Sequence, residues 1–345
     1  MNRNIENSSE VPAGADASRV GPSRRALFQG VAVLTASIAH AQAPERKAPA
    51  ASQPQPVAET TAGKVRGYTM NGVYAFKGIP YGAPTGGAAR FQRPSKPAPW
   101  VGVRSSVHYG HYLLYRAYDT PAGEDCLRLN VWTPGLAAST RKRPVMVYMH
   151  GGGFSGGSGH DLLAYDGENL ARRGDVVVVT HNHRLNVFGY LNLAETDGDR
   201  YRDSGNVGML DIVAVLEWVR DNISNFGGDP GSVTIFGQSG GGGKVAALMA
   251  MPEAKGLFHK AVNQSGPFLR FATPEDSDRL AAAVLSELNL TKSQLAQIHD
   301  VPIERLVSAS QAALRKVAVP AAAGAVVGRI GWGPTVDLKV VPTHP

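Results

Sequence analysis

The sequence predicts an α/β protein whose mostly parallel, doubly wound sheet is preceded by an antiparallel hairpin. Two runs, PVMVYM at 144–149 and VVVVT at 176–180, are continuously apolar, as expected for strands buried on both faces of a sheet. Amphipathic helical segments alternate with such runs, most clearly at 209–223. Repeated alternation of strand and helix is typical of a parallel sheet with right-handed crossovers.

The individual elements are predicted from local patterns along the chain. Residues 64–68 and 73–77 alternate like two half-buried strands joined near Asn71-Gly72, which favours a hairpin. Residues 78–82 and 94–100 are rich in glycine or proline and predict irregular loops. Strands are further predicted at 127–132, 144–149, 176–180, 233–236 and 260–264, and helices at 209–223, at 246–250 and over most of 273–316.

The segment 226–250 predicts a strand, a tight turn and a helix. On the turn, Gly237-Gln238-Ser239-Gly240-Gly241 fits G-x-S-x-G, the pattern of a nucleophile elbow. Its glycines permit close backbone approach and dihedral angles that a β-carbon would forbid. A serine hydroxyl is a poor nucleophile until a positioned base takes its proton, so the pentapeptide also fits a plain strand-to-helix turn.

A second glycine loop, HGGGF at 150–154, directly follows the predicted strand 144–149. Backbone N–H groups exposed at such a loop can converge on a developing oxyanion. Here the donors would be the amides of Gly152, Gly153 and Gly240, each typically worth ~3 kcal/mol of transition-state stabilisation. The alternative, a flexible loop, explains the glycines but not their pairing with an elbow downstream.

Three other kinds of site are disfavoured. The phosphate-loop pattern G-x-x-x-x-G-K-[ST] fails at Gln238 and Val245. His181 and His183 share a strand face and could ligate a metal, but no acidic or thiol partner has a fitting spacing, which favours structural histidines. The net charge of +7 is spread over scattered lysines and arginines, which favours solvated loops over a nucleic-acid surface.

The chain divides by composition into three parts. Residues 1–41 resemble a twin-arginine signal peptide, with Arg24-Arg25, a weakly apolar stretch and an Ala-His-Ala cleavage pattern; a disordered tail is the alternative. Residues 42–59 predict a flexible linker, and 60–345 a folded domain. The expected location is therefore periplasmic or secreted, with no stable membrane span because the apolar stretch is short and polar. Cys126 is the only cysteine, so no internal disulfide is possible.

From Phe76 onward, several blocks in order resemble the type-B carboxylesterase and cholinesterase-like family of α/β-hydrolases. The matching blocks are 76–82 with Arg90-Phe91, EDCLRLNVW at 124–132, Gly205-Asn206, Leu210-Asp211, FGGDP at 226–230 with the serine pattern at 237–241, and Gln264-Ser265-Gly266. The resemblance implies a serine esterase in which Ser239 is the acyl-forming nucleophile. It also implies an oxyanion hole of Gly152, Gly153 and Gly240, a small-molecule ester substrate and no metal or organic cofactor. The sequence does not determine an oligomeric state.

The sequence departs from the family pattern at three places. Gln238 replaces a frequent glutamate, and Cys126 lacks the upstream disulfide partner of many eukaryotic members. In the family, the acid and histidine lie well after the serine, on loops that follow later strands, whereas residues 333–342 resemble a block shortly before the acid-bearing strand. The resemblance therefore implies an incomplete domain that lacks the last strands and both triad partners, with Asp337 and His344 poor substitutes. A non-catalytic, cholinesterase-like binding protein is the alternative function.

Overall fold

The computed structural model describes residues 55–111, 122–137, 142–197, 199–266, 269–317 and 331–345, all within one compact unit that spans 52–345. The predicted signal peptide lies outside these residues. The first strand, β1, begins at Val57, so the folded part starts a few residues before the predicted boundary at 60. None of the helices in the described ranges is both long enough and apolar enough to cross a membrane.

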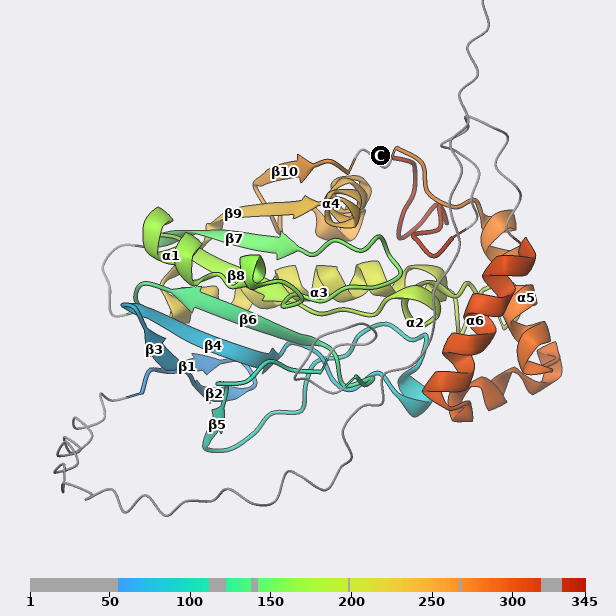
Figure 1. Cartoon of the computed structure of the whole chain (residues 1–345), viewed down its shortest axis with the longest axis horizontal. Coiled ribbons are helices and arrows are strands. Elements are labelled where there is room, and N and C mark those ends of the chain that lie inside the picture. Colours follow the sequence, from blue (N-terminus) through green and yellow to red (C-terminus); the bar gives the residue numbers. More distant parts are fainter. Residues whose placement is uncertain (1–54, 112–121, 138–141, 198, 267–268, 318–330) are drawn as a thin grey trace, which may run out of the picture. The chain divides into compact units, whose positions relative to one another are not determined.

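The strands form two sheets (Figure 1). The central sheet has the order β10-β9-β7-β8-β6-β4-β3, in which β10, β9, β7 and β8 are parallel and β6, β4 and β3 are antiparallel additions. The small sheet has the order β1-β2-β5. The strands are β1 Val57–Thr60, β2 Gly63–Arg66, β3 Tyr68–Met70, β4 Val73–Pro80, β5 Val103–Ser105, β6 Arg128–Thr133, β7 Arg143–Met149, β8 Val177–His181, β9 Gly228–Gln238 and β10 Lys260–Gln264.

The helices lie on both faces and beyond one end of the central sheet. They are α1 Glu168–Gly174, α2 Asn186–Tyr190, α3 Val207–Asn222, α4 Gly240–Ala250, α5 Pro274–Leu288 and α6 Ile303–Val317. Figure 1 shows α5 and α6 beyond the ends toward which β7 and β9 point. The alternation of strands and helices confirms the predicted α/β class.

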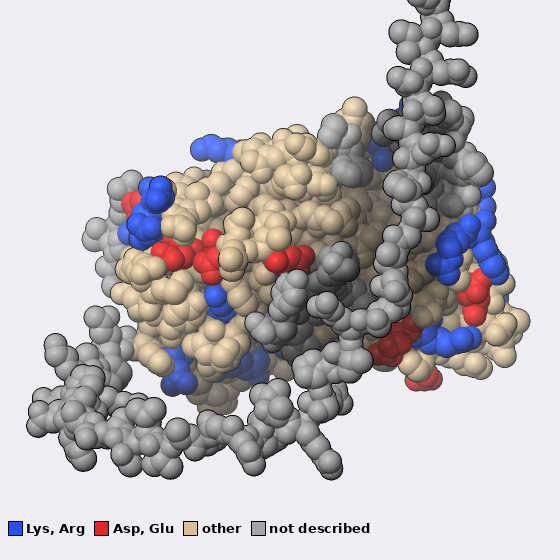
Figure 2. Space-filling model, viewed as in Figure 1, with Lys and Arg blue, Asp and Glu red and all other residues tan. Residues whose placement is uncertain are grey.

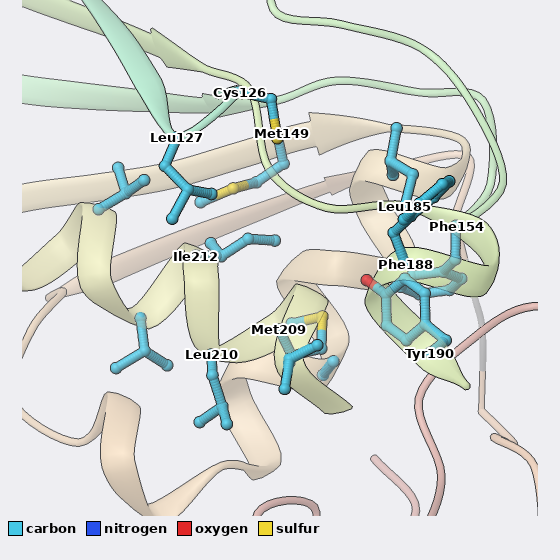
Figure 3. Close-up of a cluster of buried hydrophobic side chains, with 14 of the residues drawn as sticks. Cys126, Leu127, Met149, Phe154, Leu185, Phe188, Tyr190, Met209, Leu210 and Ile212 are labelled. Atoms are coloured by element: carbon cyan, nitrogen blue, oxygen red, sulfur yellow. The ribbon is translucent and has the colours of Figure 1, made fainter. Parts of the chain in front are cut away.

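Two hydrophobic clusters occupy opposite faces of the sheet, because side chains alternate along each strand. On one face Trp132 and Val178 pack with Ala171 of α1. On the other, Val131 and Val179 belong to the large core that includes α3. Figure 3 shows part of this core, in which residues from the strand ends, α2 and α3 meet: Cys126, Leu127, Met149, Phe154, Leu185, Phe188, Tyr190, Met209, Leu210 and Ile212. This core packs against the ends of β7 and β8.

Two details near the N-terminal hairpin differ from the prediction. The turn at Asn71-Gly72 joins β3 and β4 as expected, but the predicted strand 64–68 is split at Gly67 between the two sheets. A β-carbon on Gly67 would lie 2.3 Å from the carbonyl oxygen of Ala75, so glycine permits the close crossing there. The prediction of an irregular loop at 78–82 was wrong for its first residues, because β4 continues to Pro80. The pairing of β4 with β6 shifts register after Phe76, which lets the strand continue.

A buried ion pair ties the end of β8 to α3. Arg184 and Asp211 are 1% and 0% exposed and form a bidentate pair with distances of 2.6 and 2.8 Å. The Arg184 backbone N–H also donates to Asp211, and its guanidinium donates to the carbonyl oxygen of Gln92. With these partners the buried charges are satisfied, which fixes the chain just beyond β8.

Candidate active site

The backbone bends sharply at Ser239, between β9 and α4. Ser239 has φ 57° and ψ −122°, a conformation that costs a non-glycine residue of order 1–3 kcal/mol. Its side chain makes no capping hydrogen bond to α4 and is partly exposed. The hydroxyl is therefore presented at the surface of the bend rather than used to stabilise the helix.

Glycines let the bend lie against the end of β7. A β-carbon on Gly237 would lie 2.5 Å from the backbone of Gly241, and one on Gly241 would lie 2.0 Å from the carbonyl oxygen of Met149. Real β-carbons essentially never approach so closely. The close packing of α4 on the neighbouring strand β7 thus explains the spacing of the glycines in G-x-S-x-G.

The end of β10 supports the other side of the bend. The Ser239 backbone N–H donates to the carbonyl oxygen of Gln264 at 2.8 Å. Asn263 donates to the carbonyl oxygens of Gly242 and Gly266 and accepts from the Gly266 N–H. The Gln264-Ser265-Gly266 block noticed in the sequence is therefore part of the frame that holds Ser239.

The glycine loop after β7 lies directly beside the bend. A β-carbon on Gly240 would lie 2.3 Å from the backbone nitrogen of Gly153, and one on Gly151 would lie 3.9 Å from the β-carbon of Ser239. Gly152 and Gly153 have φ values of +88° and +63°, which favour glycine. The structure thus brings Ser239, Gly240 and Gly153 together, with Gly152 next to Gly153 on the exposed side of the loop.

The backbone amides of these glycines are available. In the part of the chain that the structure describes, the N–H groups of Gly152 and Gly153 donate no hydrogen bond. Gly240 is the first residue of α4, and the first N–H groups of a helix have no intrahelical acceptor. Two separate loops therefore supply unpaired donors beside one partly exposed serine, an arrangement that can bind an oxyanion.

No base is bonded to the serine among the described residues, where the Ser239 hydroxyl makes no hydrogen bond. Asp337 instead accepts hydrogen bonds from Asn206 and from the backbone N–H groups of Lys339 and Val341. His344 accepts from the Phe271 backbone N–H. Both side chains are therefore engaged elsewhere, in line with their expected unsuitability as triad members.

Behind the glycine loop lies a buried basic cluster, of which the sequence analysis singled out His181 and His183 but not His150 or Lys244. Lys244 of α4 is fully buried, and its ammonium donates to the carbonyl oxygen of His150 at 2.8 Å. The rings of His150 and His183 are 4.8 Å apart, and those of His181 and His183 are 5.3 Å apart. Burial, reinforced by the charge of Lys244, lowers the pKa values of all three imidazoles, that of His181 to about 3.

The cluster is not a metal site within the described ranges, where no group of three or more His, Cys, Asp or Glu side chains could hold an ion. His181 instead directs its Nε2 toward the Met149 sulfur at 3.2 Å. One sequence signal could have revealed the cluster: Lys244 is the only charged residue in the otherwise small and apolar run 240–250. A lone lysine in such a helix faces either solvent or a buried acceptor.

The comparisons with known proteins agree on one family. Residues 54–345 match the sequence pattern described as “Carboxylesterase family”. The chain is 42% identical over 297 residues to the para-nitrobenzyl esterase of Bacillus subtilis, which covers 84% of this chain and 58% of that protein. It is 36% identical over 305 residues to the phenmedipham hydrolase of Pseudarthrobacter oxydans, with the same two coverages.

Solved structures give the same result. A para-nitrobenzyl esterase superposes with a TM-score of 0.75 at 42% identity and covers 84% of this chain and 59% of its own. A carboxylesterase of Geobacillus stearothermophilus gives a TM-score of 0.74 at 39% identity, covering 84% and 57%. The chain thus spans somewhat more than half the length of these relatives.

Proposed function

Because the chain belongs to the carboxylesterase family of α/β-hydrolases, we propose that it is a carboxylic ester hydrolase with Ser239 as nucleophile and the amides of Gly152, Gly153 and Gly240 as oxyanion hole. The observation that carries this proposal is the approach of Gly240 to Gly153 beside the strained, partly exposed Ser239. A plain strand-to-helix turn at 237–241 would not need to lie so close to the glycine loop at 150–154.

The reaction follows from these positions. The Ser239 oxygen forms a bond to the ester carbonyl carbon while its proton passes to a base. The carbonyl oxygen gains the negative charge, which the three amides stabilise. The bond to the alcohol oxygen then breaks and the alcohol leaves with a proton. Water attacks the acyl-serine in the same way and releases the carboxylic acid.

We propose that this chain by itself turns over esters slowly. The support is the Ser239 hydroxyl, which has no bonded acid–base partner among the described residues. Removing the base costs on the order of 10⁶ in kcat in a serine hydrolase, whereas oxyanion hole and binding alone leave ~10³ to 10⁴ over water.

The test is covalent labelling of Ser239 by a fluorophosphonate, read by intact mass and peptide mapping, together with hydrolysis of para-nitrophenyl acetate and a para-nitrobenzyl ester. Because no base is bonded to the hydroxyl, we expect one phosphonyl group to form on Ser239 only slowly, at high reagent concentration, with none in Ser239→Ala and slow turnover of both esters. Turnover close to that of the Bacillus subtilis relative would overturn the proposal that this chain by itself hydrolyses esters slowly. Absence of any Ser239 adduct, even after prolonged incubation, would overturn the assignment of Ser239 as nucleophile.

The same unpartnered hydroxyl favours a second candidate, a non-catalytic protein that binds an ester or a partner through a cholinesterase-like surface. Such a protein needs no activated serine. Labelling separates the two functions, since binding of an ester without any Ser239 adduct is expected only of the second.

Export is proposed on the sequence alone, through the twin-arginine-type signal at 1–41. Replacement of Arg24-Arg25 by Lys-Lys is expected to leave the protein inside the cell while the unchanged chain is exported. Equal distribution of the two forms on cell fractionation would refute the signal.

Most of the lysines and arginines visible in Figure 2 lie in separate groups on the face shown, and no nucleic-acid partner is proposed.

A further inference from the structure

Lys244 connects α4 to the glycine loop through a single buried hydrogen bond. It lies five residues after Ser239, is 0% exposed, and its Nζ donates to the carbonyl oxygen of His150 at 2.8 Å. No carboxylate among the described residues pairs with it. A buried lysine without a counterion is costly, so its presence in a helix of small residues points to a role for the contact.

Among the described residues, three imidazoles feel the charge of Lys244 and one aromatic ring lies near its amino group. His150 follows β7, whereas His181 ends β8 and His183 lies just beyond it. The charge of Lys244 acts on all three. The ring of Phe154 lies 5.7 Å from Nζ. Because burial lowers the pKa values of these imidazoles, they stay uncharged near neutral pH and Lys244 carries the charge of the cluster.

The acceptor of Lys244 belongs to the peptide that leads into the proposed oxyanion hole. The His150 carbonyl is bonded to the nitrogen of Gly151, and the next two residues supply the Gly152 and Gly153 amides. Those two glycines occupy positive φ values, and although the Gly152 carbonyl oxygen accepts from the Ser155 and Gly156 N–H groups, the Gly152 and Gly153 N–H groups have no acceptor among the described residues that would fix their direction. Rotation of the His150–Gly151 peptide would therefore re-aim both donors.

We propose that Lys244 is a positioning residue: its buried amino group fixes the His150–Gly151 peptide, and the presence of its proton sets the orientation of the Gly152 and Gly153 amides. The catalytic consequence rests on the proposed function, but the structural coupling does not. Burial lowers the pKa of Lys244 to about 7, so the ammonium forms a charge-assisted bond below that pH and a weaker one above it.

The direct test observes this one peptide by NMR. His150-Gly151 is the only His-Gly pair in the sequence, so protein labelled with carbonyl-¹³C histidine and ¹⁵N glycine gives a single HNCO peak. We expect this peak to move with a midpoint near pH 7 in the unchanged chain. We expect no such titration in Lys244→Met, and an unaltered one in Lys255→Met, whose lysine is exposed.

A stationary peak in the unchanged chain between pH 5.5 and 9 would overturn the proposal even if Lys244→Met failed to fold. So would the same titration in Lys244→Met. The functional readout is the rate of Ser239 phosphonylation against pH. Loss of one strong hydrogen bond predicts ~tenfold slower labelling of Lys244→Met at pH 6, with a smaller difference at pH 8.5.

The NMR titration and the labelling rate test the two proposals separately. If Ser239 is never labelled but the peak titrates through Lys244, the proposed nucleophile fails and the positioning of the loop stands. If labelling proceeds but has the same pH dependence in the unchanged chain and in Lys244→Met, the nucleophile stands and the positioning role is refuted.

Discussion

Gly241 lies so close to Met149 that a β-carbon on Gly241 would stand 2.0 Å from the Met149 carbonyl oxygen. This contact sets the start of α4 against the last residue of β7, the strand that leads into the glycine loop. The bend that carries Ser239 and the loop that carries Gly152 and Gly153 are thus positioned by a shared backbone contact.

Replacement of Gly241 by alanine tests this contact. The added methyl group must push α4 away from β7, and overpacking of this kind typically costs roughly 1–3 kcal/mol. We expect Gly241→Ala to lower the free energy of unfolding by that amount in urea denaturation and to slow labelling of Ser239. Gly331→Ala is the matched control, because no atom of the residues that the structure describes lies within 4 Å of its β-carbon position. Equal stability of the two variants would contradict the packing.

The strained backbone of Ser239 predicts a trade between stability and reactivity. Ser239→Gly relieves the cost of φ 57°, whereas Ser239→Ala keeps the β-carbon and therefore the strain. Both lose the hydroxyl, which caps nothing. We expect Ser239→Gly to be more stable than Ser239→Ala by about 1 kcal/mol in thermal or urea unfolding, with neither variant labelled. A less stable glycine variant would show that the bend is not strained.

The buried pair between Arg184 and Asp211 predicts a large loss of stability when one partner is neutralised. Asp211→Asn leaves the guanidinium buried without its charge partner, which typically costs 3–5 kcal/mol. Asp221→Asn, which breaks the exposed pair with Arg220, is expected to cost less than about 1 kcal/mol. Comparable losses for the two variants in urea denaturation would refute the assigned burial.

The buried imidazoles predict acid sensitivity. Burial, with a contribution from Lys244, lowers the pKa of His181 from 6.5 to about 3, so between these values the unfolded chain binds a proton that the folded chain does not. Stability is therefore lost as the pH falls from about 6.5 toward 3. His181→Leu is expected to flatten this dependence in urea denaturation, and His108→Gln, at an exposed position, to leave it unchanged. Parallel curves for all three proteins would contradict the prediction.

The sequence was sufficient for the elements that periodicity and turn chemistry dictate. Strands at 144–149 and 260–264 and the turn at Asn71-Gly72 were predicted nearly residue by residue, because their apolar runs and turn residues are local signals. The extension of β4 through Gly78 to Pro80 was missed, because glycine and proline usually end a strand and the register shift that admits them depends on β6.

Sequence motifs single out the candidate site residues but say nothing of their surroundings. Ser239 and the three glycines stand out by their motifs, yet their approach depends on the adjacency of β7 and β9. The lone charge of Lys244 in the run 240–250 is a signal, but it fits either solvent or a buried acceptor, and lysine is almost never fully buried. Its acceptor is a backbone carbonyl, for which no residue type is diagnostic.

The most direct measurement is a crystal structure of the chain with a phosphonyl group on Ser239. We predict the phosphoryl oxygen within about 3 Å of the backbone nitrogens of Gly152, Gly153 and Gly240. A phosphoryl oxygen directed into solvent, with these three amides bonded elsewhere, would contradict the proposed oxyanion hole and with it the esterase mechanism.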